Sequence, residues 1–258
     1  MLAEDFPLEF AALTDVGRKR TNNEDAVRVE PEHGFVVLAD GLGGYNAGEV
    51  ASRMAVEGIG AGLICWLQSA SALPENESPR AASDALRALE TCVDEVNHAI
   101  FEDAACVPDH AGMGTTLVVA LAYQGQMLIG HIGDSRAYCL CDGMLTRLTR
   151  DHSLLQEQLD AGLMTPAQAA VSPHYNLLTR GLGVEATVSL DVQTVLLQKG
   201  NIYLLCSDGL TNMVSDADIA QLLGSGLPLP GMAQALVDQA NANGGQDNVT
   251  VALIRVEK

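Results

Sequence analysis

Residues 34–44 have the sequence GFVVLADGLGG, an apolar run that ends in Asp40 and continues into a glycine-rich turn. A compact apolar run closed by an Asp-Gly pair is typical of a buried strand that delivers a loop. The glycines after Asp40 let the backbone turn sharply and bring a carbonyl oxygen to a ligand. The stretch therefore predicts a carboxylate held rigidly at the end of a core strand.

The same design occurs twice more along the chain. Asp208 follows the apolar run IYLLC and Ser207, whereas Asp247 directly precedes the run NVTVALI. Taken singly, each motif is a common turn sequence. Three carboxylates aimed at one point repel one another unless a cation lies between them. Together they predict a shared site for hard divalent cations, which oxygen ligands suit.

The pattern of apolar residues around these motifs predicts the remaining elements. Helical spacing indicates two long helices, over 47–68 and 81–105, with a loop over 67–80 between them. Strand periodicity over 115–123, 126–132 and 136–140, with tight turns between, predicts three antiparallel strands, because a parallel connection needs a dozen residues or more. Further strands are expected over 8–14, 26–30, 34–39, 188–196, 201–206 and 249–256, and shorter helices over 154–161, 216–223 and 231–241.

Helices outside antiparallel sheets indicate an α+β layered architecture. The 258 residues suffice for one large domain and are few for two. Residues 151–183 are mostly irregular, and segments of this length without regular structure are usually functional. We therefore expect a single domain over residues 1–258, with a flap-like insertion at about 151–183.

The charge balance excludes several classes of partner. Lys and Arg number 14 against 33 Asp and Glu, for a net charge of −19, and such a surface repels nucleic acid and anionic lipid. The N-terminus has no signal-peptide pattern, and no stretch has the run of about 20 apolar residues of a membrane span. Six cysteines without a C-x-x-C pair are typical of free thiols in a reducing compartment. We expect a cytoplasmic monomer that neither binds nucleic acid nor inserts into a membrane.

The acidic motifs belong to a longer ordered series. The series comprises Thr14–Gly17 followed by Arg20, Asn23–Asp25, Leu38–Gly44, Gly112–Thr116, His131–Arg136, Asp151–Ser153, Leu178–Gly183, Ser207–Leu210 and Gln246–Asn248. In this order the motifs resemble those of the compact bacterial members of the protein phosphatase 2C (PP2C, or PPM) family, over nearly the whole chain. The resemblance implies a four-layer α/β/β/α sandwich, in which helix pairs flank two antiparallel sheets.

The resemblance also implies a binuclear Mg²⁺ or Mn²⁺ centre. In the family, the aspartate matching Asp40 bridges both cations, the carbonyl matching Gly41 binds one, and those matching Asp208 and Asp247 hold the other. The resemblance further implies that Asp134 binds a third, weaker metal and that Glu24 and Asp25 bind the metals through water molecules. It also implies that Arg20 binds the phosphate. Register with the Asn23–Asp25 motif favours Arg20 over Arg18 for that last role.

The function implied is hydrolysis of phosphoserine and phosphothreonine in proteins, by water that the two cations activate, in opposition to a bacterial-type Ser/Thr protein kinase. Two alternatives remain open: a catalytically silent regulator that binds phosphoproteins, and a hydrolase of small phosphate esters. Leu42 stands where many eukaryotic members have histidine, so the general acid is unassigned. His131, on an apolar strand, is predicted to be a hydrogen-bonded core histidine rather than a metal ligand.

Overall fold

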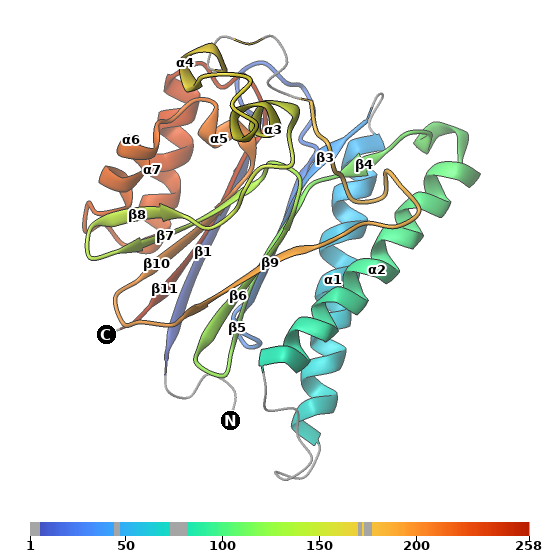
Figure 1. The fold of residues 1–258 in the computed structure, drawn as a ribbon. Helices are drawn as coiled ribbons and strands as arrows, with labels where there is room; N and C mark the ends of the chain where they lie inside the picture. Colours follow the sequence, from blue (N-terminus) through green and yellow to red (C-terminus); the bar gives the residue numbers. More distant parts are fainter. Residues whose placement is uncertain (1–5, 44–46, 73–81, 170–171, 173–176, 258) are drawn as a thin grey trace.

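The structure is a computed structural model that describes residues 6–43, 47–72, 82–169, 172 and 177–257. Two antiparallel sheets pack face to face, and helices cover both outer faces (Figure 1). The predicted four-layer α/β/β/α architecture is confirmed.

The first sheet is built around the strand that comes last in the chain. Its order is β1 (Leu8–Asp15), β11 (Val249–Val256), β10 (Ile202–Cys206), β7 (Arg136–Cys141) and β8 (Met144–Arg147). β11 pairs with β1 along its whole length, from Leu8 opposite Val256 to Asp15 opposite Val249. On its other edge β11 pairs with β10. The first and last strands of the chain are therefore joined side by side in one sheet.

The second sheet contains the apolar run that leads to Asp40. Its order is β2 (Asp25–Glu30), β3 (Phe35–Leu42), β5 (Leu117–Tyr123), β6 (Gln126–Ile132) and β9 (Asp191–Leu196), with β4 (Gly114–Thr115) paired to the end of β3. In the β2–β3 register, Asp25 lies directly opposite Asp40. β3 continues through Asp40 to Leu42, so this aspartate lies within the strand rather than after it.

The helices form the two outer layers (Figure 1). α1 (Ala47–Ala72) and α2 (Ala82–Cys106) pack on the second sheet, whereas α5 (Asp208–Thr211), α6 (Asp216–Leu223) and α7 (Leu229–Ala242) pack on the first. The region after β8 contains α3 (Leu154–Asp160) and α4 (Pro166–Ala169), and a short 3₁₀ helix (Pro108–His110) follows α2.

The core strands are apolar on both faces, which explains their uninterrupted apolar sequences. In β3, Phe35 and Val37 pack toward α1 and α2, whereas Val36 and Leu38 pack into the layer between the two sheets. All four of these side chains are fully buried. A half-buried strand would instead alternate apolar and polar residues.

One predicted connection is wrong. Strands 126–132 and 136–140 were expected to pair through a hairpin turn, but β6 lies in the second sheet and β7 in the first. Gly133, with φ +97°, turns the chain from one sheet to the other. A connection of three residues can join two strands paired in one sheet, and it can equally lead from a strand of one sheet to a strand of the other. The consequence is that Asp134 lies at the seam between the sheets.

Smaller differences concern the ends of elements. α1 continues to Ala72 where a loop is predicted from residue 67; residues 73–80 of that loop, and residue 81 at the start of the second predicted helix, lie outside the described part of the chain. The strand predicted over 188–196 begins at Asp191. β8 and α5 were not predicted, since each is only four residues long and too short to show a period.

Among the described helices, α1 alone has the length and composition of a membrane span, with a mean hydropathy of 1.3 over Ala47–Ala70 and 44% of that window buried. Its residues Ala51, Ala55, Ile59 and Leu63 are fully buried against the second sheet and α2. Burial in the protein core accounts for this apolar face, and the absence of membrane insertion stays a prediction.

Candidate metal and phosphate site

A cavity of about 90 Å³ lies at the seam between the two sheets. It gathers every residue predicted for the site except Asp25. The lining comprises Arg20, Glu24, Asp40, Gly41, Leu42, Asp134, Leu178, Asp208, Asp247 and Asn248. Residues up to 227 positions apart in sequence therefore meet at one point, as the contact of Arg20 with Asp247 shows.

The backbone of Asp40 is fixed on both sides by two threonines at the β4–β5 junction. Its N–H donates to Thr116 Oγ1 at 3.0 Å, and its carbonyl accepts from Thr115 Oγ1 at 2.8 Å and from the Thr116 N–H at 2.8 Å. Thr116 Oγ1 also contacts Ser135 Oγ at 2.7 Å. These contacts aim the Asp40 carboxylate into the cavity without freedom to rotate the peptide unit.

Gly41 is required to be glycine by its surroundings. A Cβ at this position would lie 2.2 Å from the carbonyl oxygen of Gly48, in the first turn of α1, and 2.7 Å from that of Glu24. Both neighbours are backbone atoms and cannot move aside cheaply. The Gly41 N–H donates to the Glu24 carbonyl at 3.1 Å, which ties β3 to the start of β2.

Asp25 lies beneath the cavity rather than on its wall. Its Oδ2 accepts from Ser207 Oγ at 2.8 Å, whereas its Oδ1 is buried and has no hydrogen-bond partner within the described residues. An unsatisfied carboxylate oxygen in the interior costs about 1–3 kcal/mol or more. This atom is therefore one sign that the cluster is built to receive a positive group.

Asp208 and Asp247 approach the cavity from the first sheet. Asp208 is the first residue of α5, directly after β10, and its Oδ2 accepts from Asn212 Nδ2 at 3.0 Å. Asp247 precedes β11; its Oδ1 accepts from the Asn248 N–H at 2.9 Å and its Oδ2 from Arg20 Nη2 at 2.8 Å. Asp247 is thus turned toward Arg20, whose side chain is 48% exposed.

The carboxylates repel one another strongly. Burial, followed by repulsion from Asp25 and Asp208, raises the pKa of Asp40 well above its usual value. Burial and Asp208 raise the pKa of Asp134 to about 7. Burial likewise raises the pKa of Asp25 and of Asp208 to about 6. Without positive charge, the cluster holds protons at a pH where isolated carboxyls have lost them.

This donor set fits a hard divalent cation. Carboxylate oxygens and a carbonyl oxygen are the ligands that Mg²⁺ and Mn²⁺ prefer. The clustered acids, their raised pKa values and the orphaned Asp25 Oδ1 all indicate a cationic ligand. Asp247 is paired with Arg20 in this structure, so binding of a cation by Asp247 would compete with that ion pair.

Asn248 is a site residue that the sequence does not identify by role. Its side chain accepts from the Glu24 N–H at 2.8 Å and donates to the carbonyls of Val16 and Asn22 at 3.0 and 2.9 Å. It thereby ties the loop that carries Arg20 and Glu24 to the start of β11. The Asp-Asn pair in the sequence marks its position, but its partners are backbone groups far along the chain.

A second cluster of ligand-type side chains lies behind the β6–β7 connection. Ligand atoms of His131, His152 and Asp191 lie within 4.8 Å of one another. Arg180 Nη1 lies among them, 2.6 Å from Asp191 Oδ1 and 3.1 Å from His152 Nε2, so a guanidinium already occupies the place of a cation. His131 Nε2 contacts the Arg150 carbonyl at 2.8 Å, which confirms the predicted hydrogen-bonded core histidine.

His152 supports the turn that places Asp134. Its Nδ1 accepts from the Gly133 N–H at 3.1 Å, and burial, with repulsion from His131, lowers the pKa of His152 to about 4. The ring is therefore neutral near pH 7 and remains an acceptor for this N–H. The sequence carries no signal for this contact, because nothing in the pattern brings residue 152 beside residue 133.

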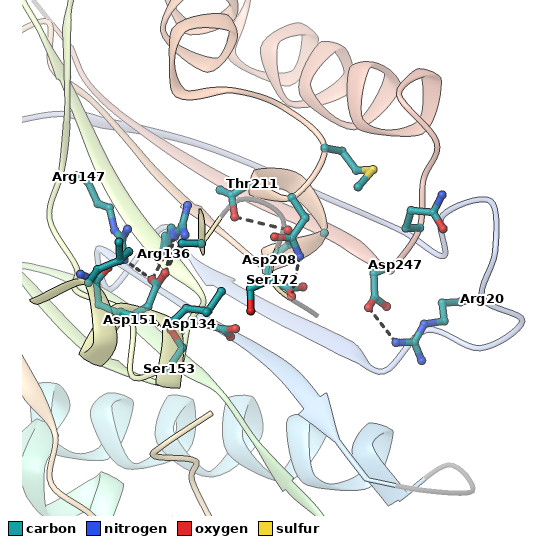
Figure 2. A pocket seen from close by; sticks show the side chains of 18 residues that line it. Arg20, Asp134, Arg136, Arg147, Asp151, Ser153, Ser172, Asp208, Thr211 and Asp247 are labelled. Atoms are coloured by element: carbon teal, nitrogen blue, oxygen red, sulfur yellow. Dashed lines mark hydrogen bonds and ion pairs between the residues drawn. The ribbon is translucent and has the colours of Figure 1, made fainter. Parts of the chain in front are cut away.

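Two larger cavities adjoin the site. One, of about 760 Å³, shares Arg20, Asp134, Asp208 and Asp247 with it and extends past Arg147 and Asp151 (Figure 2). The other, of about 600 Å³, shares Leu42 and Leu178 with it and is lined further by residues 179–189. The acidic cluster is therefore continuous with two larger cavities, which extend the space beside it.

Comparisons with known proteins agree with this geometry. A family model described as Protein phosphatase 2C matches residues 16–247. The chain is 40% identical over 244 residues to the serine/threonine phosphatase stp of Listeria innocua, covering 93% of each protein. It is 37% identical over 254 residues to the protein phosphatase PhpP of Streptococcus pneumoniae, covering 97% of this chain and 98% of that protein.

Solved structures give the same picture. The serine/threonine phosphatase PstP/Ppp of Mycobacterium tuberculosis superimposes with a TM-score of 0.83 at 36% identity, covering 100% of both chains. The S. agalactiae serine/threonine phosphatase gives a TM-score of 0.86 at 36% identity over 97% of this chain and 100% of that one. A PstP catalytic domain in complex with two manganese ions gives a TM-score of 0.83 at 35% identity, over 98% of this chain and 100% of that one.

Proposed function

Because the chain belongs to the protein phosphatase 2C family of metal-dependent serine/threonine protein phosphatases, we propose that its reaction takes place at the 90 Å³ cavity, with two divalent cations bound by Asp40, Gly41, Asp208 and Asp247. The observation that carries this assignment is the convergence of these residues on one small cavity, in which the pKa values of Asp40 and Asp208 are raised. The similarity to a PstP domain with two manganese ions supports the number of ions.

Each residue has a role that follows from its position. Bound divalent cations lower the pKa of water and so supply the attacking group near neutral pH. Asp40, whose backbone is held by Thr115 and Thr116, would be the carboxylate shared by the two cations. Arg20 offers a planar fork to the phosphoryl oxygens. Asp134 would contribute to a third, weaker site, and Glu24 and Asp25 would act through water.

The two larger cavities that adjoin the site favour a phosphoprotein over a small phosphate ester as substrate. A free phosphate ester fills only the central cavity, whereas cavities of about 760 and 600 Å³ adjoin it. A peptide segment that carries phosphoserine or phosphothreonine can occupy the adjoining cavities as well. The intact acidic cluster and Arg20 likewise argue against a catalytically silent regulator, which has no need of them.

The cellular setting belongs to the same proposal. We place the protein in the cytoplasm as a monomeric single domain that reverses the action of a Ser/Thr protein kinase. The six cysteines support a reducing compartment, since all are free thiols and three of them, Cys92, Cys139 and Cys206, are buried.

The test is hydrolysis of a phosphothreonine peptide with Mn²⁺. Phosphate release should stop on addition of EDTA and in the Asp208→Ala variant, while the variant keeps its fold by circular dichroism. Full activity of Asp208→Ala would refute the assigned site. Comparing kcat/KM on a phosphoprotein and on free phosphothreonine separates the two substrate classes: a higher value for the free amino acid would favour the small-ester alternative.

A further inference from the structure

The 760 Å³ cavity beside the site contains a second cationic feature, formed by Arg136 and Arg147 around Asp151 (Figure 2). Arg20 and Asp247 lie at one end of the residues drawn, and Arg147 lies at the other, with Asp208 between them. The arginines are therefore well separated from the phosphate-binding end of the cavity. The proposed function does not use them.

The two guanidiniums share a single carboxylate. Arg136 donates to Asp151 through Nε at 3.1 Å and through Nη2 at 2.7 Å. Arg147 also donates to Asp151, through Nη2. Asp151 is 6% exposed, so this pairing is enclosed by protein. Arg136 also interacts with Asp134 and Asp208 of the metal site, so the positive charge that is left over on this part of the wall is that of Arg147.

Arg136 and Arg147 differ in how far their donors are used. The remaining guanidinium nitrogen of Arg136, Nη1, donates a hydrogen bond to the hydroxyl of Tyr138 at 3.3 Å. Arg147 makes one hydrogen bond within the described residues, its Nε is buried without an acceptor, and its side chain keeps 26% exposure on the cavity wall. The two side chains are about equally exposed, with 24% for Arg136, so what distinguishes Arg147 is that more of its guanidinium donors are without a partner within the described residues.

Beyond Asp151 and the acids of the metal site, the described residues of this wall carry no negative charge. The lining residues between Asp151 and Asp208 in sequence are uncharged, namely Ser153, Leu155, Gln156, Leu159, Ala169 and Ser172. Asp216 accepts from Tyr138 at 3.1 Å but does not line the cavity. Asp160, which lies nearby in sequence, is paired with Arg150. The chain has a net charge of −19, so a pair of arginines on the wall of a cavity contrasts with the negative charge of the protein as a whole.

We propose that Arg147 is a specificity-determining residue, which binds a second anionic group of the phosphoprotein substrate, several residues away from the phosphoresidue. The group is a carboxylate or a second phosphoryl group, since both match the donors of a guanidinium. The negative net charge of the protein alone would favour basic residues around the phosphoresidue. A preference for an acidic group at Arg147 is therefore the opposite of what the net charge predicts. The inference rests on the proposed function, because the subsite is useful only to an enzyme that binds phosphoprotein segments.

The experiment compares phosphothreonine peptides in which one flanking position at a time is Glu, Gln or phosphoserine, with kcat/KM as the measurement. At the position that reaches Arg147, the wild-type protein should prefer Glu or phosphoserine over Gln about fivefold to tenfold, as expected for one partly exposed charge-assisted contact. The preference should fall as ionic strength rises. In Arg147→Gln it should disappear, with the Gln peptide turned over at an unchanged rate.

Arg87→Gln is the matched control, because Arg87 lies on α2 and its side chain is 73% exposed. It should keep the wild-type preference. Arg147→Gln should fold, since Arg136 still holds Asp151.

If Glu is preferred, the natural group is a carboxylate; if only phosphoserine is preferred, the natural group is a second phosphoryl group. Equal kcat/KM for all three peptides at every position, or a preference that survives in Arg147→Gln, would overturn the inference. Failure of the proposed function is distinct, because it would abolish turnover of the Gln peptide as well.

Discussion

Arg20 serves two partners in this site. It pairs with Asp247 at 2.8 Å, and that hydrogen bond, the largest contribution, raises the pKa of Arg20 above its usual value. Its side chain is still 48% exposed on the wall of the larger cavity. The guanidinium can therefore turn from Asp247 to a phosphoryl group once Asp247 has another positive partner.

Replacing Arg20 with alanine tests this role. Loss of a charge-assisted bidentate contact should lower kcat/KM for a phosphothreonine peptide by about 10- to 100-fold. Arg18→Ala is the matched control, because the contact of Arg18 with the Gly245 carbonyl, at 2.7 Å, uses its backbone N–H and survives truncation. It should stay close to the wild-type value. Unchanged kcat and KM in Arg20→Ala would remove Arg20 from the site.

Among single residues, the sequence identifies the metal ligands better than the residues that hold those ligands in place. Asp40, Asp208 and Asp247 were found because each stands at the end of an apolar run. Ser207, Asn248 and His152 were not given roles. Each supports the site through a few hydrogen bonds, mostly to backbone groups, and no local pattern encodes such a partner. Arg20 was chosen only through its register in a family motif.

The junction of β10, α5 and β11 is the closest approach between elements that carry the metal ligands. Gly209, in α5, packs so tightly on the start of β11 that a Cβ would lie 1.9 Å from the Asn248 carbonyl oxygen and 2.9 Å from its carbon. Both are backbone atoms, so any side chain must push α5 and β11 apart. Asp208 and Asp247 flank this contact.

Gly209→Ala should therefore destabilise the fold by about 1–3 kcal/mol, the usual cost of overpacking, and weaken Mn²⁺ binding through displacement of Asp208. Urea unfolding in EDTA and calorimetric Mn²⁺ titration measure the two effects. Gly231→Ala is the control, since its nearest contacts would be ordinary, at 3.6 and 3.8 Å, in helix α7. It should be neutral or slightly stabilising. Equal stability of both variants would contradict the tight junction.

Elements with a clear period were predicted well, and connections were not. The helices over 47–68 and 81–105 and the longer strands of both sheets follow from apolar spacing, whereas the short strands β4 and β8 do not. The step from β6 to β7 was taken for a hairpin, because a short connection at Gly133 is compatible both with pairing and with crossing between sheets. Which one forms depends on the packing of the two sheets, and local sequence does not specify it.

For the whole molecule, the buried acids link stability to pH. Their folded-state pKa values, about 6 for Asp25 and Asp208 and about 7 for Asp134, exceed the ordinary value of 3.8. An acid whose pKa is raised on folding stabilises the folded state while protonated, and this contribution is lost as pH rises through the folded pKa. His152, whose pKa is lowered to about 4, acts in the opposite direction, but only below about pH 6.5.

The metal-free protein should therefore lose stability between about pH 6.5 and 8. We expect a fall of about 1–2 kcal/mol, seen as a melting temperature lower by several degrees in EDTA. Mn²⁺ should raise the melting temperature most near the upper end of this range, where the carboxylates are ionised. Asp134→Asn should flatten the pH dependence in EDTA. A melting temperature that rises with pH over this range in EDTA would show that the acids do not repel as described.

The position of β11 between β1 and β10 has a consequence for synthesis. While the ribosome makes this chain, β1 and β10 emerge before the strand that must lie between them, and the edges that will pair with it stay exposed until then. Unpaired strand edges are prone to aggregation, and these two edges receive their partner only with residues 249–256. Asp247 arrives just before that strand. A nascent chain that stalls upstream thus carries no assembled catalyst, and dephosphorylation begins only once this last strand has been made.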